Sequence, residues 1–558
     1  MSEPLLTPAA PAGAASEPLL PTLTPDQLSR VAQRGVRRTT SRGDVLFEPG
    51  EKAAPIFVVV SGELEVVRPA GAQEIPIITY GPGQFSGEVN AISGRPAIAR
   101  MRVSNAGEVI EFDRDRLMNL IQTDAELSEI FMRTLILRRV ALIDRQIGDV
   151  IVVGSAHSAG TLRVKEFLAR NGHPFHYLDL DHDQEAQEVL DRFHVTPSDI
   201  PVVICRDVAV LRNPTEAQVA DCLGFNDAID EGHVNDMVIV GAGPAGLAAA
   251  VYGASEGLDV VVLESSVPGG QAGSSSRIEN YLGFPAGVSG LDLTGRAYTQ
   301  ALKFGAHVVV AKRATRLGCE GHRYVVEMAD GLRILGRTIV IATGAEYRRP
   351  ALENLSAFEG AGVYYGATAL EAQLCAGSEV VVVGGGNSAG QAAVFLASTA
   401  SRVHILVRGA GLAETMSRYL IRRIEENPAI SLRTHTELIA LEGNDRLERI
   451  RWRHEQTREI EAHDIRHVFI MAGADPNTRW LDGCVALDDN GFVKTGADLS
   501  TEDLEASTWP LARPPYLLET SRPGIFAVGD VRAGNVKRVA SAVGEGSIAV
   551  SFAHRLLR

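Results

Sequence analysis

The pattern of hydrophobic and polar positions divides the chain into three stretches. In the first, residues 25–145, short apolar runs at 44–48, 55–62 and 63–67 are separated by Pro-Gly and Gly. This spacing is typical of short antiparallel strands and predicts a small β-roll. From residue 113 to about residue 144 the apolar positions recur with a helical period, so helices are expected to follow the roll.

The other two stretches alternate strands with helices. Residues 149–226 hold two apolar runs, VIVVG and PVVIC, with an amphipathic segment after the first, and predict a compact α/β unit. The acidic segment 227–236 is a natural linker. From residue 237 to the end, strands and helices alternate regularly, which predicts mostly parallel sheets. Residues 1–24, rich in Pro, Ala, Leu and Glu, predict a disordered tail.

The third stretch contains two glycine-rich turns, each after a buried strand. The first includes Gly241, Gly243 and Gly246. Glycines in such a turn let the backbone approach a pyrophosphate, and the N-terminus of the following helix faces its negative charge. The next strand ends at Glu264, where a carboxylate accepts hydrogen bonds from an adenosine ribose. This turn therefore predicts a dinucleotide that lacks a 2′-phosphate.

The second turn differs at its acidic position. It contains Gly384 and Gly386, but Val407 stands where the first site has its glutamate, and Arg408 follows. An arginine pairs with a 2′-phosphate, whereas a carboxylate repels it. The second site therefore favours NADPH. Two such sites in one chain favour a flavoenzyme, in which nicotinamide delivers hydride to FAD.

Composition adds mainly exclusions. The 558 residues are 45% hydrophobic and 22% charged, and their net charge of −15 argues against nucleic acid as a partner. The uncharged run from Met237 to Ser255 fits a strand, turn and helix, so no membrane span is expected. Five cysteines lie far apart and never form Cys-x-x-Cys. That suits a cytoplasmic protein without a disulfide framework or a metal site.

The third stretch resembles low-molecular-weight thioredoxin reductases. The motifs that carry the resemblance are GAGPAGLAAA (241–250), GGQ (269–271), ENYLGFP (279–285), ATGA (342–345), GGGNSAGQAA (384–393) and GIFAVGDV (524–531), in the family's order. The resemblance implies an FAD-binding domain at 237–346 and 470–558. It also implies a NAD(P)H-binding domain at 347–469, rotation between the two during turnover, and a homodimer.

The same resemblance, together with the two turns, gives the cofactor-binding positions. They are Gly241, Gly243, Gly246, Glu264, Gln271, Asn280, Thr343, Gly344, Gly384, Gly386, Asn387, Ser388, Ala389, Arg408, Gly529 and Asp530. The family's second phosphate-binding arginine is replaced by Gly409, although Arg418, Arg422 and Arg423 lie nearby. NADH therefore stays an alternative to NADPH.

One departure from this family changes the expected chemistry. Thioredoxin reductases carry a redox-active Cys-Ala-Thr-Cys just before the second nucleotide turn, and this chain reads Gly366-Ala367-Thr368-Ala369. Without paired sulfurs no disulfide can store two electrons. Cys375 lies beyond the motif without a neighbouring cysteine, and it is interpreted as a packed structural residue.

The first stretch resembles a cyclic-nucleotide-binding domain, through GDVLFEPGE, PIFVVVSGELEV and GQFSGEVNAISGRPA. That family uses a Gly-Glu pair for the ribose hydroxyl and an arginine for the cyclic phosphate. Glu88 is present, but Ala97 occupies the arginine position, with Arg95 and Arg100 nearby. Loss of the charged donor predicts weak or absent cyclic-nucleotide binding. The alternative to a nucleotide-binding role is a fold kept for interaction or dimerisation.

The second stretch resembles glutaredoxin and thioredoxin. The redox Cys-x-x-Cys of those families aligns with residues 158–161, which read Ser-Ala-Gly-Thr, and Ile200-Pro201 matches their cis-proline. This domain is therefore expected to be redox-inactive. His173, His176 and His182 invite a metal interpretation, but alternation along a strand explains them and no metal is expected.

These features predict a multidomain protein: a β-roll of cyclic-nucleotide-binding type, a thioredoxin-like α/β unit and two Rossmann-type dinucleotide-binding domains. The leading hypothesis is an FAD-dependent NAD(P)H oxidoreductase that passes electrons directly to an unknown acceptor, a small molecule or a protein. The alternatives are a thioredoxin-disulfide reductase by family assignment, an enzyme similar to ferredoxin–NADP reductase, and a regulatory flavoprotein that senses redox state.

Overall fold

The computed structural model describes residues 19–70, 73–155, 158–180, 199–205, 209–318, 323–444 and 446–558, with single positions 183 and 196. The chain forms two compact units. The first contains the described residues up to Gly154, Val164–Ala228 and the short piece Leu302–Gly305. The second contains the remainder, including both glycine-rich turns.

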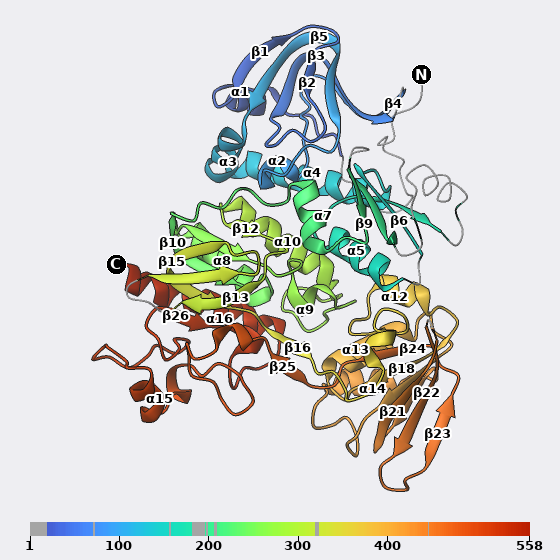
Figure 1. The fold of residues 1–558 in the computed structure, drawn as a ribbon. Helices are drawn as coiled ribbons and strands as arrows, with labels where there is room; N and C mark the ends of the chain where they lie inside the picture. The colour runs from blue at the N-terminus through green and yellow to red at the C-terminus, as the bar shows by residue number, and fades with distance from the viewer. Residues whose placement is uncertain are drawn as a thin grey trace. The chain divides into compact units, whose positions relative to one another are not determined.

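The first unit begins with an antiparallel β-roll (Figure 1). Its strands are β1 (Val36–Thr40), β2 (Val45–Phe47), β3 (Ile56–Ala70), β4 (Gln73–Tyr80) and β5 (Arg100–Phe112), in the order β1-β5-β3-β4 with β2 beside β5. The expectation of separate strands at 55–62 and 63–67 was wrong. Gly62 adopts a φ of 83° and forms a bulge, which leaves β3 continuous.

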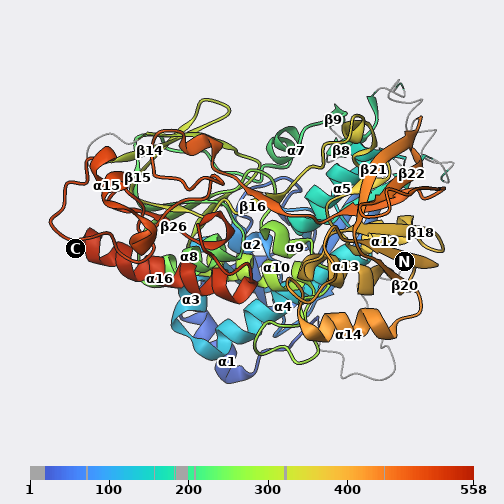
Figure 2. The same cartoon turned by 90° about the horizontal axis from the view of Figure 1, so that it is seen from below.

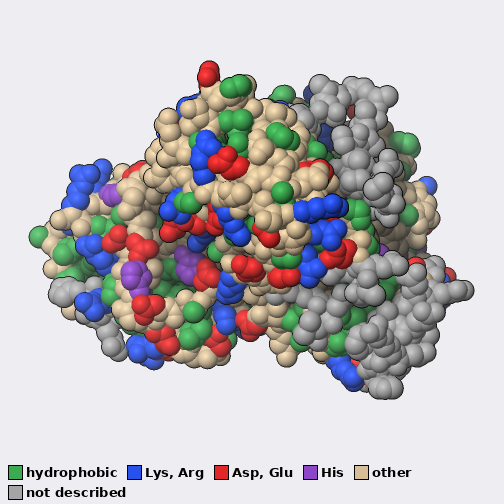
Figure 3. All heavy atoms as spheres, turned by 90° about the horizontal axis from the view of Figure 1, so that it is seen from above, with side chains coloured by type: hydrophobic (Ala, Val, Ile, Leu, Met, Phe, Trp, Pro, Cys, Tyr) green, Lys and Arg blue, Asp and Glu red, His purple; other side chains and the backbone are tan. Residues whose placement is uncertain are grey.

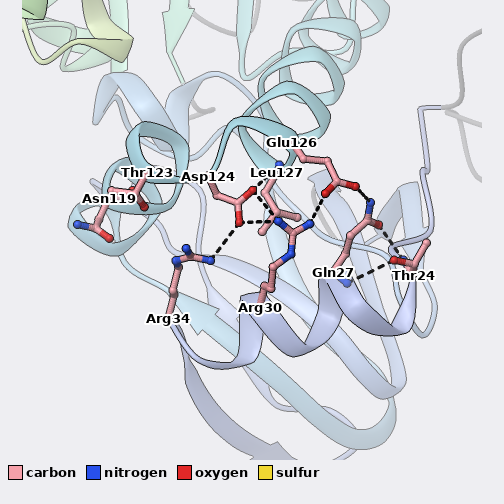
Figure 4. A network of polar contacts seen from close by, with 9 residues as sticks. All are labelled: Thr24, Gln27, Arg30, Arg34, Asn119, Thr123, Asp124, Glu126 and Leu127. Carbon is pink, nitrogen blue, oxygen red and sulfur yellow. Dashed lines mark hydrogen bonds and ion pairs between the residues drawn. The ribbon is translucent and has the colours of Figure 1, made fainter.

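Helices close the roll at both ends of its sequence: α1 (Pro25–Ala32), α2 (Asn90–Ser93), α3 (Arg114–Thr123) and α4 (Ala125–Asp144). Asp124 separates α3 from α4 and caps α4 through the Leu127 amide at 3.1 Å (Figure 4). It also pairs with Arg30 at 2.9 Å and Arg34 at 3.2 Å. Burial opposes the charge of Asp124, but the Leu127 bond and the two arginines lower its pKa overall.

The α/β segment follows, most of it in the first unit, while residues 155–163, which include the start of its first helix, are counted with the second unit. Its elements are β6 (Val150–Gly154), α5 (Ala159–Arg170), β7 (His176–Asp179), β8 (Val202–Cys205), β9 (Ala209–Arg212) and α7 (Glu216–Leu223). The sheet order is β7-β6-β8-β9, with β6 and β7 parallel and the other pairs antiparallel. The Ile200-Pro201 bond is cis. His173 is a buried core histidine bonded to Asp149 at 2.9 Å, and His182 lies outside the described residues.

The second unit contains a seven-stranded sheet of order β12-β11-β10-β15-β14-β13, with β26 beside β15. Its strands are β10 (Val234–Val240), β11 (Val260–Leu263), β12 (His307–Val309), β13 (Ala314–Gly318), β14 (Tyr324–Met328), β15 (Arg333–Ile341) and β26 (Ile525–Ala527). Its main helices are α8 (Pro244–Ser255), α10 (Gly290–Lys303) and α16 (Val539–Leu557). Helix α8 lies against α16 (Figure 2), where a Cβ on Gly546 would stand 2.2 Å from the Ala245 carbonyl oxygen.

A second parallel sheet, of order β17-β24-β18-β19-β20, is inserted between β15 and β26. Its strands are β17 (Val363–Tyr364), β18 (Glu379–Val383), β19 (Arg402–Leu406), β20 (Ile430–Arg433) and β24 (His467–Ile470). Helices α12 (Ala369–Leu374), α13 (Asn387–Leu396) and α14 (Arg418–Glu426) accompany it, as does the antiparallel sheet β21 (Thr436–Gly443), β22 (Leu447–His454) and β23 (Ile460–His463). The chain enters and leaves through β16 (Ala345–Tyr347) and β25 (Ala474–Pro476), which pair with each other.

Surface charge, helix hydrophobicity and one cysteine can be compared with the expectations from composition. Acidic and basic side chains are intermixed on the face in Figure 3. Among the ion pairs of the β-roll, Arg37 and Arg38 of β1 pair with Glu108 and Glu111 of β5. Within the described ranges, no helix is long and apolar enough to cross a membrane. Cys484 is disulfide-bonded, a bond that the expectation of a chain without a disulfide framework did not include. Spacing along the sequence gave no signal for that bond.

Candidate functional site

The first glycine-rich turn joins β10 to α8 by a close approach of backbone segments. Gly241 has a φ of 106°, and a Cβ there would lie 2.3 Å from the Ala342 carbonyl oxygen. A Cβ on Gly246 would lie 1.8 Å from the Gly241 carbonyl oxygen. Both positions therefore require glycine, one for the turn and one for the packing of helix against strand.

Gly243 stands apart from these two because it borders open space. It is the N-cap of α8, no side chain caps this helix, and a Cβ there would meet nothing closer than 3.9 Å. The free amides of α8 and the open position next to them suit a pyrophosphate. Glu264 is buried beside the turn and accepts hydrogen bonds from the amides of Ala242 at 2.8 Å and Ser266 at 3.0 Å.

A third segment of the same domain carries Gly529 and Asp530. The Gly529 amide donates to Glu545 of α16 at 2.7 Å, and Glu545 also accepts from Arg532 at 2.7 Å. Burial raises the pKa of Asp530 against the lowering effect of Lys537. A carboxylate held in this setting is a suitable acceptor for ligand hydroxyls.

Four other positions were expected to bind a cofactor. Thr343, Gly344 and Gln271 lie near one another, whereas Asn280 lies apart. Thr343 and Asn477 exchange hydrogen bonds of 2.8 and 3.0 Å, and the Gly344 carbonyl accepts from the Asn477 amide at 3.1 Å. The Gln271 side-chain amide donates to the carbonyl of Ala345. Asn280 is exposed and does not join this group.

The second glycine-rich turn joins β18 to α13 in the same manner. Gly384 has a φ of 144°, and a Cβ there would lie 2.4 Å from the Met471 carbonyl oxygen. Gly386 is the uncapped N-cap of α13 and has nothing within 4 Å of a Cβ. The Asn387 side chain accepts from the Ser417 amide at 2.8 Å, which orients the first residue of the helix. Ala389 is fully buried.

Tyr347 lies beside the second glycine-rich turn. Burial raises the pKa of its hydroxyl, a hydrogen bond with Ser388 lowers it, and the charge of Asp530 raises it again. The hydroxyl therefore lies within hydrogen-bond reach of Ser388, at the start of the second turn's helix, and within the electrostatic influence of Asp530.

The basic residues near the second turn have different roles. Val407 is 5% exposed, and Arg408 is exposed with no ion pair among the described residues. Arg423, which sequence reasoning offered as a supplementary phosphate ligand, instead binds the Glu279 carboxylate at 2.5 and 2.7 Å. Arg408 is therefore the better-placed cation for a 2′-phosphate.

The segment at 366–369 lies against the first domain. Ala367 forms an isolated bridge with Ser275, and a Cβ on Gly366 would lie 3.4 Å from the Ser274 Cβ. Cys375 is fully buried, and burial raises the pKa of its thiol to about 11. A buried, protonated thiol is a poor nucleophile. Tyr364 packs on Phe469, with ring centroids 5.2 Å apart, and the Tyr365 hydroxyl donates to Glu359 at 2.7 Å.

The cyclic-nucleotide cassette of the first unit is internally paired. The Glu88 carboxylate binds Arg139 at 2.5 Å and accepts from the Asn90 amide at 3.0 Å. Arg95 donates to the Asn171 carbonyl at 2.9 Å and lies 4.1 Å from the ring centre of Phe225. Arg100 pairs with Glu48 at 2.9 Å and with Glu74. Neither arginine is available to replace the donor that Ala97 lacks.

Sequence reasoning missed three residues of this arrangement: Tyr347, Asn477 and Glu545. Each bonds a motif residue that is distant along the chain, and none lies within a motif itself. Tyr347 is the one of the three with a local signal in the sequence, since it lies two residues after the ATGA motif.

Comparison with known proteins agrees with this geometry. Residues 235–546 match the family described as pyridine nucleotide-disulphide oxidoreductase, and residues 37–124 match the cyclic nucleotide-binding domain. A thioredoxin reductase of Ureaplasma parvum is 31% identical over 323 residues, which cover 57% of this chain and 96% of that protein. One of Mycolicibacterium smegmatis is 32% identical over 324 residues, covering 58% and 97%.

Solved structures give the same result. The thioredoxin reductase of Lactococcus lactis in its FR conformation superimposes with a TM-score of 0.52 at 26% identity, over 58% of this chain and 99% of that one. The enzyme of T. acidophilum gives 0.51 at 27% identity, over 57% and 98%. The match at 235–546 spans more than half of the sequence and both glycine-rich turns. With its cyclic nucleotide-binding domain in front, the chain therefore belongs to the pyridine nucleotide-disulphide oxidoreductase family, as an FAD-dependent NAD(P)H oxidoreductase of thioredoxin reductase type.

Proposed function

We propose that this enzyme transfers electrons from NADPH through FAD directly to an external acceptor, without a dithiol relay. The observation that carries the proposal is the segment Gly366–Ala369, which has no sulfur and lies against Ser274 and Ser275. Relatives of this chain are named thioredoxin reductase, but disulfide reduction by a thiolate needs a reactive cysteine. Cys375 does not supply one, because it is buried with a raised pKa.

The residues present suit both cofactors. Gly243, the α8 amides, Glu264 and Asp530 would hold FAD, and Gly386, the α13 amides and Arg408 would hold NADPH. When bound, FAD accepts a hydride from the nicotinamide and releases two electrons to an acceptor. The contribution of the chain is orientation, since Tyr347 forms a hydrogen bond with Ser388 of the second turn. NADPH is preferred over NADH because Val407 provides no carboxylate and Arg408 has no competing partner among the described residues.

A panel of acceptors tests this proposal. With purified, FAD-loaded protein and NADPH, ferricyanide and a quinone are expected to be reduced over many turnovers, while thioredoxin-coupled disulfide reduction is absent. The double variant Gly366→Cys with Ala369→Cys restores the family's pair, and the single variant Gly366→Cys is its control. Thioredoxin reduction by the unmodified chain contradicts the proposal. The proposal is also contradicted if NADPH reduces the flavin once and slowly and no acceptor supports continued turnover. That result would favour a redox sensor.

A further inference from the structure

The β-roll contains a cavity of about 80 Å³, several times the space that one water molecule requires. Its walls are mainly apolar, and they include Val66, Ile77, Tyr80, Ala99, Met101 and Leu142. The polar residues at its boundary are Glu88, Asn90, Arg95 and Arg138. A mainly apolar cavity with few polar groups is the usual form of a small-molecule site.

Arg138 of α4 is the unusual member of this lining. It is 2% exposed, its Nε donates to the Leu19 carbonyl at 2.9 Å, and its Nη1 donates to the Gly87 carbonyl at 2.9 Å. Its Nη2 has no hydrogen-bond partner, and no carboxylate of the described residues lies within ion-pair distance. Burial lowers the pKa of this guanidinium, consistent with a charge that lacks compensation. A buried unpaired charge is costly and calls for a partner.

The other charged groups at the cavity already have partners. Glu88 binds Arg139, and Arg95 binds Asn171, which lies outside the roll. The rings of Tyr80 and Phe85 lie with their centres 4.9 and 5.0 Å from the Arg138 guanidinium, and they surround it with apolar surface. The cavity is therefore bordered by one buried guanidinium that contacts two backbone carbonyls and two aromatic rings but has no carboxylate partner among the described residues.

We propose that this cavity binds a small monocarboxylate with an apolar body, whose carboxylate pairs with Arg138. The apolar walls suit an alkyl or aromatic body, and the Arg138 guanidinium, which borders the cavity without a carboxylate partner among the described residues, suits a single negative charge. A cyclic nucleotide is disfavoured, because Ala97 offers its phosphate no donor and the Glu88 carboxylate is engaged by Arg139. The site is independent of the dinucleotide turns and of the proposed electron transfer.

Calorimetric titration of the full chain with hexanoate tests this inference, with 1-hexanol as the uncharged counterpart and cyclic AMP as the competing ligand class. One hexanoate is expected to bind per chain, and 1-hexanol to bind roughly tenfold or more weakly, since a charge-assisted hydrogen bond is lost. Arg138→Gln should weaken hexanoate binding by a similar factor, and Arg138→Lys should restore part of it. Arg116→Gln, at an exposed arginine paired with Asp113, is the matched control.

A second variant keeps the test independent of the stability of Arg138 substitutions. Ala99→Leu fills the cavity and leaves Arg138 in place, so it is expected to abolish hexanoate binding while the protein stays folded. Equal affinity for hexanoate and 1-hexanol, unchanged binding by a folded Arg138→Gln protein, or tighter binding of cyclic AMP than of hexanoate would each overturn the inference. Absence of any hexanoate binding would do so as well.

Discussion

Replacement of Gly243 and of Gly386 by alanine is expected to affect the two proposed cofactor sites separately. Each glycine is the N-cap of its helix in extended backbone, with φ and ψ of −71° and −177° at Gly243 and −91° and 178° at Gly386. Alanine adopts these angles without strain. A Cβ would meet nothing closer than 3.9 Å at Gly243 and nothing within 4 Å at Gly386. The folding cost is therefore that of a poorer N-cap, about 0.5–1 kcal/mol.

The effect on binding should be much larger than the effect on folding. A methyl group at either position occupies the space through which a pyrophosphate approaches the helix amides, and each lost charge-assisted bond contributes about 1.5–3 kcal/mol. Gly243→Ala is therefore expected to weaken FAD binding roughly 10- to 150-fold. Gly386→Ala should retain FAD and raise the KM for NADPH by a similar factor.

The assays are FAD titration by fluorescence quenching, steady-state kinetics at saturating FAD, and thermal unfolding of the apoprotein. Gly246→Ala is the contrasting variant, because its Cβ would lie 1.8 Å from the Gly241 carbonyl oxygen and should disrupt the fold itself. The assignment of cofactors to turns is refuted if folded Gly243→Ala protein binds FAD normally, or if Gly386→Ala loses FAD rather than NADPH affinity.

Three further predictions follow from individual side chains. Arg408→Ala should raise the KM for NADPH roughly tenfold or more and leave that for NADH nearly unchanged, whereas equal losses in steady-state kinetics would show that Arg408 does not bind the phosphate. Cyclic AMP should give no micromolar binding in calorimetry, because Arg95 and Arg100 are engaged by Asn171 and Glu48; micromolar affinity would mean that one of them leaves its partner. Cys375 should resist iodoacetamide at pH 8 in the native protein, because a pKa of about 11 keeps its buried thiol protonated at that pH. Rapid alkylation, measured by mass spectrometry, would contradict its burial.

Local patterns in the sequence account for the two glycine-rich turns. Gly241, Gly246 and Gly384 are glycines because the backbone meets itself there, and such constraints are visible in a sequence. The strand break predicted at Gly62 was wrong. A glycine with a positive φ is found in bulges as well as in turns, and pairing with β5 decides which of the two forms here. The domain boundaries given by the resemblance stay proposals.

Long-range contacts could not be predicted in the same way. Glu545 reaches Gly529 from the first half of α16, and Tyr347 forms a hydrogen bond with Ser388, which lies 41 positions further along the chain. In the sequence, nothing distinguishes Arg138 from the other arginines of the predicted helical stretch. Its burial depends on how α4 packs against the roll. The disulfide of Cys484 likewise depends on tertiary packing rather than spacing.

The central claim, that no dithiol stands between FAD and the acceptor, is tested most directly by anaerobic titration of the FAD-loaded protein with NADPH. Absorbance at the flavin band should be lost after one two-electron equivalent per FAD, both in the unmodified chain and in a Cys375→Ala variant. A Cys484→Ser variant controls for the remaining disulfide and should give the same endpoint. An endpoint of two equivalents that falls to one when Cys375 is replaced would contradict the account.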